Sequence, residues 1–378
     1  MKDWEIKKLS DICSIQTGKH DANHATETGK YRFYTCAAQY LWCDTVRFSG
    51  ECLILPGNGV NVGEVYYYNG DFDAYQRTYV ISEISKDVYA RFLYYNMLLN
   101  WKQNGTAKQY GSATNFIKIG NFLEYEIPLP PLEEQKRIVK ILDEKFAMLE
   151  TVKANAKANL QNAKDLFQSQ LTKVFSNTTW EKKRLGDCGS FKNGMNFAST
   201  DTGYTIRSLG VGDFKNLYQI DDTEQLSEIS LKAAPSDDYL LKDGDIVFVR
   251  SNGNKELVGR CLLVYPKNIP TTYSGFCIRF RKDYDELDAD FLLHYMKAES
   301  SRKILNGKEG ANISNLNQKI LGDFEVPVPP LPEQKRIVEQ LDSLSEKVRS
   351  LEEIYTKQLA NCDELKQAFL AKAFNGEL

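Results

Sequence analysis

The sequence contains no long apolar run and no paired cysteines, and each absence removes a class of protein. No segment approaches the roughly 18 consecutive apolar residues that a membrane helix needs. The charged N-terminal segment MKDWEIKKLSDI lacks the apolar stretch of a signal peptide, so we expect a cytoplasmic protein. The eight cysteines include no C-x-x-C pair, which argues against a zinc ribbon or a disulfide framework.

Histidine is also scarce, with three residues in the chain. His20 and His24 are four residues apart but lack the glutamate of an H-E-x-x-H pattern, since Asp21 stands at that position. Asn23 and Gly29 favour a loop there. The sequence therefore predicts no metal site.

An excess of basic charge is missing as well, because the formal net charge is −3. Proteins that grip nucleic acid through phosphate contacts alone normally carry a basic footprint. A nucleic-acid reader of this composition would need local clusters of charge, or charge supplied by a partner.

The strongest positive signal is an internal repeat. Residues 127–143 (IPLPPLEEQKRIVKILD) match residues 326–342 (VPVPPLPEQKRIVEQLD) at 12 of 17 positions. A weaker echo relates the segment from Trp4 to Gly18 to the segment from Trp180 to Gly194. The chain therefore alternates two divergent globular parts, 1–126 and 179–325, with two similar helical parts, 127–178 and 326–378.

Each helical part begins with a Pro-Pro pair followed by glutamate, which is typical of a helix start. Apolar residues then recur at steps of three and four, so each helix of about 40 residues needs a partner helix. Because the second globular part follows the first helix at once, the second helix must run back. We expect an antiparallel pair with the globular parts at opposite ends. The expected pairing residues are Val139, Leu142, Phe146, Leu149, Leu341, Leu344, Val348 and Leu351.

The globular parts have the pattern of mixed α/β domains. Short strand-like runs such as residues 52–55, 65–68, 246–250 and 261–265 are bounded by Asn-Gly turns. Helical spacing predicts short helices over 88–100 and 289–301.

Side chains suited to nucleic acid gather in the predicted loops. Arginine and lysine can pair with guanine, asparagine and glutamine with adenine, and hydroxyl groups or lysine can hold phosphates. The candidates in the first part are Arg32, Tyr34, Gln76, Arg77, Lys108, Tyr110, Ser112, Thr114 and Asn115. The candidates in the second part are Arg207, Arg250, Ser251, Asn252, Lys255, Tyr273, Ser274, Lys308, Asn312, Ser314 and Asn315.

The paired P-x-P-P-L-x-E-Q-K-R-I-V segments, the diverged domain before each and the ending AFLAKAFNGEL resemble the specificity subunits of type I restriction-modification systems. The likeness covers essentially the whole chain. It implies an α+β fold in which two mixed α/β target-recognition domains are separated by two long antiparallel coiled-coil helices with pseudo-two-fold symmetry.

The resemblance also implies a function in phage defence and a set of partners. Each domain would read one half of a bipartite, asymmetric site in double-stranded DNA, and the chain would dock two adenine methyltransferase (modification) subunits, with two restriction (motor-nuclease) subunits as a possible addition. S-adenosylmethionine would be bound by the methyltransferases, and ATP and Mg by the motor-nucleases. A structural or partner-docking role carries over to the shared motif residues Gln135, Lys136, Arg137, Gln334, Lys335 and Arg336.

Motifs for catalysis are missing from the sequence. The Pro-Pro pairs open helices instead of forming the [NDS]-P-P-[YFW] loop of an adenine methyltransferase, and no G-x-x-x-x-G-K-[ST] phosphate loop occurs. We therefore expect no catalytic residue in this chain. Two alternatives stay open: a specificity subunit of a methylation-only or type II-like system, and a coiled-coil adaptor whose two heads bind proteins.

Overall fold

The computed structural model describes residues 4–107, 109–110, 115–176, 179–214, 218–254, 257–305 and 315–378. The chain forms two compact units. The first comprises Met1–Lys157 with Thr356–Leu378, and the second comprises Ala158–Tyr355. Each unit therefore contains one globular part together with pieces of both long helices.

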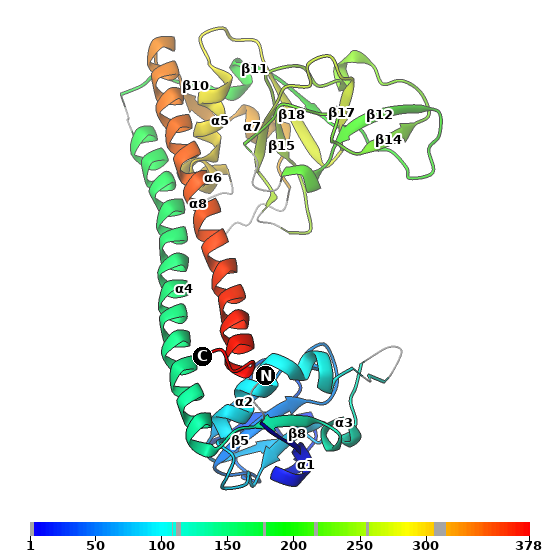
Figure 1. Ribbon diagram of the computed structural model, residues 1–378. Helices are drawn as coiled ribbons and strands as arrows, with labels where there is room; N and C mark the ends of the chain where they lie inside the picture. Colours follow the sequence, from blue (N-terminus) through cyan, green and yellow to red (C-terminus); the bar gives the residue numbers. More distant parts are fainter. Residues whose placement is uncertain are drawn as a thin grey trace. The chain divides into compact units, whose positions relative to one another are not determined.

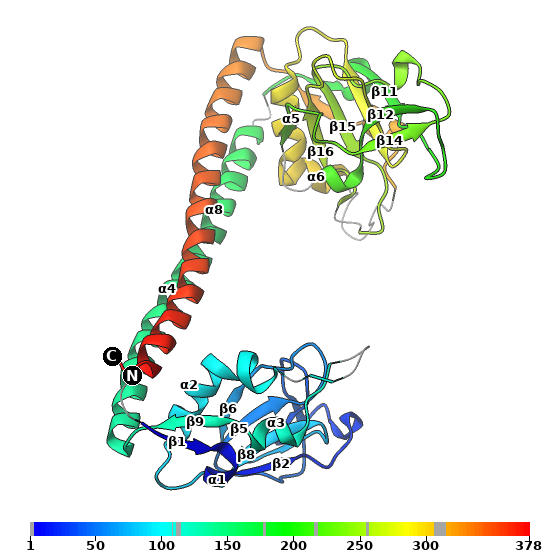
Figure 2. The same ribbon diagram turned by 45° about the vertical axis from the view of Figure 1, so that its right-hand side comes forward.

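The first unit is built from short strands in three small sheets, with the orders β2-β8-β5-β6, β4-β3-β7 and β1-β9. Figure 2 shows α2 lying against the sheet that contains β5, β6 and β8. The strands are β1 (Glu5–Lys8), β2 (Ser14–Thr17), β3 (Tyr31–Tyr34), β4 (Leu41–Cys43), β5 (Glu51–Pro56), β6 (Tyr66–Asn69), β7 (Phe72–Ala74), β8 (Thr78–Ser82) and β9 (Glu126–Leu129). The helices are α1 (Leu9–Ile12), η1 (Ala22–His24), α2 (Ala90–Asn100), η2 (Trp101–Gly105), α3 (Ile119–Leu123) and α4 (Leu132–Phe175), of which the last continues beyond this unit.

The second unit also has three sheets, with the orders β11-β18-β15-β16-β13, β14-β12-β17 and β10-β19. The strands are β10 (Lys182–Arg184), β11 (Gly189–Asn193), β12 (Tyr204–Leu209), β13 (Gln219–Ile220), β14 (Glu228–Leu231), β15 (Asp245–Val249), β16 (Cys261–Val264), β17 (Thr271–Tyr273), β18 (Cys277–Lys282) and β19 (Glu325–Pro327). The helices are η3 (Leu185–Asp187), η4 (Val211–Phe214), η5 (Asp237–Tyr239), α5 (Ala289–Lys297), α6 (Glu299–Leu305), α7 (Gln318–Gly322) and α8 (Leu331–Phe374).

The two units share one topology although their globular sequences have diverged. Strands β2, β8, β5 and β6 have the same order as β11, β18, β15 and β16, and the second unit adds β13 at the edge. In both units the three-stranded sheet contains one parallel pair, β3 with β7 and β12 with β17. The structure therefore shows the duplication in the regions where sequence similarity fades.

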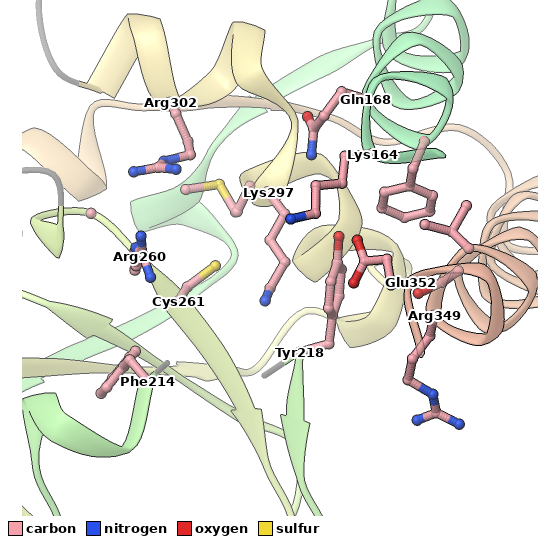
Figure 3. A pocket seen from close by; sticks show the side chains of 15 residues that line it. Lys164, Gln168, Phe214, Tyr218, Arg260, Cys261, Lys297, Arg302, Arg349 and Glu352 are labelled. Carbon is pink, nitrogen blue, oxygen red and sulfur yellow. The ribbon is translucent and has the colours of Figure 1, made fainter. Parts of the chain in front are cut away.

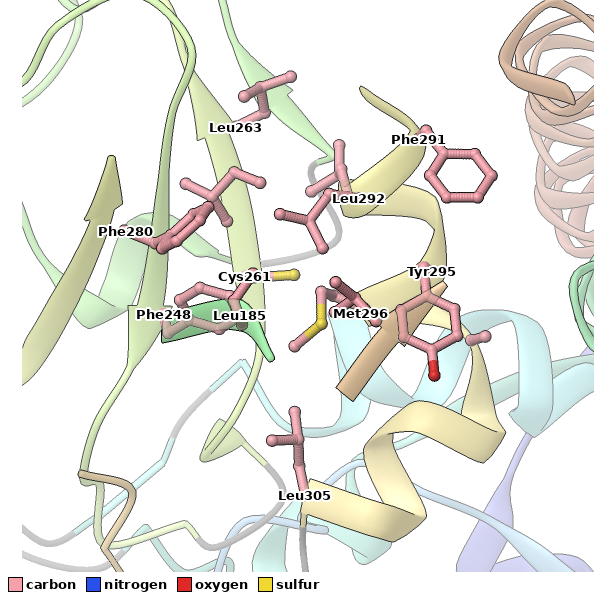
Figure 4. Close-up of a cluster of buried hydrophobic side chains, with 14 of the residues drawn as sticks. Leu185, Phe248, Cys261, Leu263, Phe280, Phe291, Leu292, Tyr295, Met296 and Leu305 are labelled. Atoms are coloured by element: carbon pink, nitrogen blue, oxygen red, sulfur yellow. The ribbon is translucent and has the colours of Figure 1, made fainter. Parts of the chain in front are cut away.

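The core of each unit forms between a sheet and a helix, because the central strands are buried along most of their length. Figure 4 shows this core in the second unit, where Phe248, Leu263 and Phe280 from the strands meet Leu292 and Met296 of α5. Burying a side chain of this size stabilises the fold by roughly 1.5–3 kcal/mol. The expected strands over 52–55, 65–68, 246–250 and 261–265 are all present within one or two residues.

Both long helices are 44 residues long (Figure 1). In the first unit Arg137 donates to the carbonyl of Leu378, and Lys153 forms an ion pair with Asp363. Because one residue number rises as the other falls, the helices run antiparallel. Leu142 is fully buried in the core that also holds Leu370.

In the second unit the buried seam joins Phe167 and Leu171 of α4 with Ile337 and Leu341 of α8. Of the other predicted pairing residues, Val139, Phe146, Leu344 and Val348 lie in or against the cores. Leu149 is buried but belongs to neither core cluster. Leu351 is 36% exposed and does not belong to the buried seam.

One expected helix is two helices. The run predicted over 289–301 breaks at Ala298, whose backbone is extended, and α6 begins at Glu299. The apolar spacing continues across the break, so the sequence pattern does not reveal it.

Candidate nucleic-acid interface

Three loops of the first unit lie side by side. The amide of Gly57 donates to the carbonyl of Arg77 at 2.9 Å, and the carbonyl of Gly57 accepts from Ile117 at 2.9 Å. The amide of Gly59 donates to the carbonyl of Asn115, also at 2.9 Å. We call these loops the first loop cluster, which consists of the described residues 57–65, 75–77, 109–110 and 115–118.

The first loop cluster exposes several predicted DNA-binding residues. Gln76, Arg77, Tyr110 and Asn115 are all exposed. The Lys118 ammonium lies 4.2 Å from the centre of the Tyr110 ring, so a cation and an aromatic face are paired at this surface. Amide, guanidinium and aromatic groups of this kind can contact base edges and stacked bases.

The second unit repeats this arrangement. Leu316 donates to the carbonyl of Arg250 at 2.8 Å, as Ile117 does to Gly57 in the first unit. The amide of Arg250 donates to the carbonyl of Phe276, also at 2.8 Å. We call this set the second loop cluster, which consists of the described residues 250–254, 274–276 and 315–317. It contains the predicted residues Arg250, Ser251, Asn252, Ser274 and Asn315.

Two apolar side chains in the loop clusters were not predicted. Val60 is 99% exposed in the first cluster and Phe276 is 59% exposed in the second. Apolar groups that a fold leaves in water at a polar surface can contact a thymine methyl group or a partner protein. In the sequence they could have been found as isolated apolar residues inside Gly- and Asn-rich loops.

Arg32 and Tyr34 were expected in a loop, and that placement is wrong. Both lie on β3. The Arg32 guanidinium lies 4.3 Å from the ring centres of both Tyr40 and Tyr68, and it donates to the Tyr34 hydroxyl at 3.2 Å. Tyr34 is 9% exposed, and burial raises the pKa of its hydroxyl. Arg32, Tyr34, Tyr40 and Tyr68 therefore form one packed cluster.

Arg207 and Tyr273 also lie on strands instead of loops. Arg207 donates to the carbonyl of Leu226 at 2.9 Å and pairs with Glu228 at 3.2 Å. Tyr273 is fully buried, and its hydroxyl lies 3.3 Å from the carbonyl of Lys192, to which it donates. A side chain with no exposed surface offers nothing to DNA, so Tyr273 belongs to the core.

The remaining predicted residues lie outside the described residues. They are Lys108, Ser112, Thr114, Lys255, Lys308, Asn312 and Ser314.

A buried glutamine fixes the start of α4. The Gln135 side chain is fully buried, and its amide nitrogen donates to the carbonyls of Asp87 at 2.9 Å and Pro130 at 2.8 Å. Its oxygen accepts from the backbone N–H of Tyr89 at 2.8 Å. The shared motif thus joins the long helix to the loop that precedes α2.

Gln334 makes the same three contacts in the second unit. It accepts from the N–H of Asp288 at 2.8 Å and donates to the carbonyls of Glu286 at 2.7 Å and Pro329 at 2.6 Å. The basic residues beside the two glutamines behave differently, since Lys136, Arg137, Lys335 and Arg336 are all exposed. The glutamine therefore has a structural role within each unit, and the docking role of the exposed basic residues stays a prediction.

The second unit also contains a cavity of about 420 Å³ between β16, α5 and the two long helices. Figure 3 shows that Lys297 points into it beside Tyr218 and Cys261. The Lys297 ammonium lies 3.7 Å from the centre of the Tyr218 ring. Burial lowers the pKa of Lys297 to about 8.

Comparison with known proteins identifies the class. The family model for the type I restriction modification DNA specificity domain matches residues 1–161 and 177–359. The specificity subunit of the type I restriction enzyme EcoDI of Escherichia coli is 28% identical, over all of this chain and 89% of that protein. The StySPI specificity subunit of Salmonella potsdam is 30% identical over 71% of this chain and 61% of its own length.

Solved structures agree on the fold. One chain from a study of complex assembly and conformational transition in a type I system aligns with a TM-score of 0.79 at 20% identity, covering 100% of this chain and 99% of its own. The HsdS subunit of Thermoanaerobacter tengcongensis aligns with a TM-score of 0.57 at 21% identity, covering 100% and 98%.

The chain thus consists of a duplicated α/β unit joined to long antiparallel helices, with an equivalent loop cluster in each unit. The chain belongs to the type I restriction-modification DNA specificity family and is a specificity subunit of that class. Among the described residues, no helix has the length and apolar character needed to cross a membrane.

Proposed function

We propose that each unit reads one part of a bipartite, asymmetric DNA target in the major groove through its loop cluster. The observation that carries this proposal is the equivalence of the two clusters in backbone contacts combined with their difference in side chains. The first offers Gln76, Arg77 and Asn115, and the second offers Arg250 and Asn252. Unlike side chains on the same frame would read unlike half-sites.

The exposed basic residues beside the buried glutamines would help to dock two adenine methyltransferase subunits, which would carry S-adenosylmethionine. Motor-nuclease subunits, where present, would carry ATP and Mg. The specificity subunit would perform no chemistry itself. The long helices would set the length of the unread spacer between the half-sites.

The charge balance supports a division of work within the complex. A chain with a net charge of −3 releases few counterions when it meets DNA. The methyltransferases would supply most of the phosphate contacts. The isolated subunit should therefore bind DNA weakly, and the complex should bind it strongly with a steep dependence on salt.

Sequencing of methylated DNA from cells that express the chain with its methyltransferase tests the proposal. We expect methylated adenine within a motif of two unequal parts separated by a fixed gap. Exchanging residues 4–126 for those of another member of the family should change one part and leave the other unchanged. A soluble complex that methylates no such motif would overturn the proposal.

A further inference from the structure

The first unit contains a cluster of three potential metal ligands that its function as a DNA reader does not require. His20, His24 and Asp73 each offer a ligand atom, and these atoms all lie within 4.8 Å of one another. The sequence alone predicts no metal site at the two histidines, because Asp21 stands where an H-E-x-x-H pattern has glutamate. The fold adds a third potential ligand, Asp73, from β7.

The local backbone brings the three groups together. His20 forms a parallel bridge with Tyr75, the residue that follows β7. The η1 turn places the His24 ring parallel to the His20 ring, with centroids 3.7 Å apart. Asp73, in the middle of β7, lies next to both.

The charge of Asp73 calls for a cation. Its side chain is 1% exposed, and a buried carboxylate is costly unless it is paired. Its oxygens accept from two neutral donors, the backbone N–H of Ala74 at 2.7 Å and the Thr45 hydroxyl at 2.6 Å. The nearest His20 nitrogen is 3.5 Å away, beyond normal hydrogen-bond length.

We propose that His20, His24 and Asp73 bind one divalent transition-metal ion, with Zn²⁺ as the favoured ion. Imidazole and carboxylate are its usual ligands, with bonds of about 2.0 Å and ligand atoms about 3.3 Å apart in a tetrahedral site. The His20 side chain is 40% exposed, so its ring can turn out of the stack to complete the geometry. Water occupies the fourth position.

Thr45 orients the site from outside. The Thr45 hydroxyl donates to the Asp73 carboxylate, which as an anion can only accept. The Thr45 oxygen can then accept a hydrogen bond from the Nε2 nitrogen of His24, 2.7 Å away. Groups that hold a metal ligand in this way usually change metal affinity by about 10–100-fold when removed.

The site adjoins the first loop cluster. The backbone N–H of Gln76 donates to the carbonyl of His20 at 2.9 Å. A metal ion that fixes His20 therefore also stiffens the turn that carries Gln76 and Arg77. The ion would act as a structural staple for one reading surface.

The second unit provides an internal comparison. Its bridge between Met195 and Ser274 matches that between His20 and Tyr75, and Thr272 occupies the register position of Asp73. Methionine and threonine do not form a zinc site of this kind. One ion per chain is therefore expected.

Titration of untagged, chelator-washed full-length protein with Zn²⁺ and Co²⁺ tests the proposal. We expect one ion per chain, a higher midpoint of thermal unfolding, and visible Co²⁺ absorption of a tetrahedral site without thiolate charge-transfer bands. His20→Gln should weaken binding more than about tenfold, and Thr45→Val by about tenfold. Asn23→Ala, an exposed change on the same turn, should bind as the unaltered chain does.

The partly exposed His20 keeps the test valid if Asp73→Asn fails to fold. Equal affinity in the His20→Gln and unaltered proteins would overturn the proposal, as would a Co²⁺ spectrum dominated by sulfur ligands. Methylated-motif sequencing is a separate readout, so this result is distinct from that for DNA recognition.

Discussion

Where β3 pairs with β7 in the first unit and β12 pairs with β17 in the second, the equivalent residues are both arginines, Arg32 and Arg207. The surroundings of the two arginines differ. Arg32 lies between two tyrosine rings, whereas Arg207 pairs with Glu228 and a backbone carbonyl. A second matched position shows the same behaviour: Tyr95 donates to Asp143 in the first unit, and His294 contacts Asp342 at 2.8 Å in the second. The backbone frame has been kept while the contacts that hold it have been replaced.

The comparison separates two kinds of residue. Gln135 and Gln334 make identical contacts to backbone atoms, which every sequence provides, so the same side chain works in both units. Residues that contact other side chains can change whenever their neighbours change. The following predictions test this distinction.

The largest effect is expected at an ion pair found in the second unit. Asp245 is 1% exposed and binds Arg281 through two contacts of 2.6 and 2.8 Å. Arg281→Met should lower the free energy of unfolding of this unit by about 3–5 kcal/mol, because the buried carboxylate loses its partner. Chemical denaturation, monitored by hydrogen exchange of the β15 amides, measures the loss of stability.

The first unit suggests the control. Cys52 and Ser82 occupy the register positions of Asp245 and Arg281. The double change Asp245→Cys with Arg281→Ser should be less harmful than Arg281→Met alone, because no buried charge remains. A double variant less stable than Arg281→Met would show that the pair is essential to the frame itself.

The next effect should be the same in both units. Gln135→Leu and Gln334→Leu each remove three hydrogen bonds and leave buried backbone groups without partners, at a cost of about 3 kcal/mol. Lys136→Gln, an exposed neighbouring change, should shift stability by less than about 0.5 kcal/mol. Denaturation of the three variants provides the comparison, and losses that differ strongly between the two glutamines would contradict their equivalence.

A smaller and one-sided effect is expected on DNA recognition. In the complex with the methyltransferase, Arg77→Ala should cost about 1–3 kcal/mol in binding and relax specificity in one half-site, and Arg250→Ala should do so in the other. Competition binding with DNA altered in one half-site at a time measures this. Lys86→Ala, exposed beyond the opposite end of β8, is the control, and relaxation of both half-sites by either arginine variant would contradict separate reading.

The sequence was sufficient to predict the helices and the duplication, because both are repetitive. Leu142 and Leu341 recur in a pattern whose period is that of a helix pair. Strand segments were also predictable from apolar runs such as residues 52–55. Contacts between distant segments were not: the burial of Tyr273 and the approach of Asp73 to His20 depend on sheet pairing that no local pattern reveals. Gln135 was recognised as part of a motif, but its hydrogen bonds to Asp87 and Tyr89 required the fold.

The smallest effect concerns Lys297 of α5. The equivalent sequence position in α2 of the first unit is Leu98, an apolar residue. Burial lowers the pKa of Lys297 from 10.5 to about 8 in the folded chain. Between pH 8 and 10.5 the unfolded chain therefore binds more protons than the folded chain, so this group makes stability rise with pH, by up to about 1.4 kcal/mol per pH unit.

Lys297→Leu, which copies the first unit, should abolish this rise while the Leu98→Met control retains it. Denaturation of both variants and the unaltered chain at pH 7, 8 and 9 measures the pH dependence of stability. Because the nearby thiols are present in all three proteins, the difference between the pH profiles isolates the contribution of Lys297. Identical pH profiles for Lys297→Leu and the unaltered chain would show that the lysine remains solvated. The cavity around Lys297 would then not make the pH dependence of the second unit differ from that of the first.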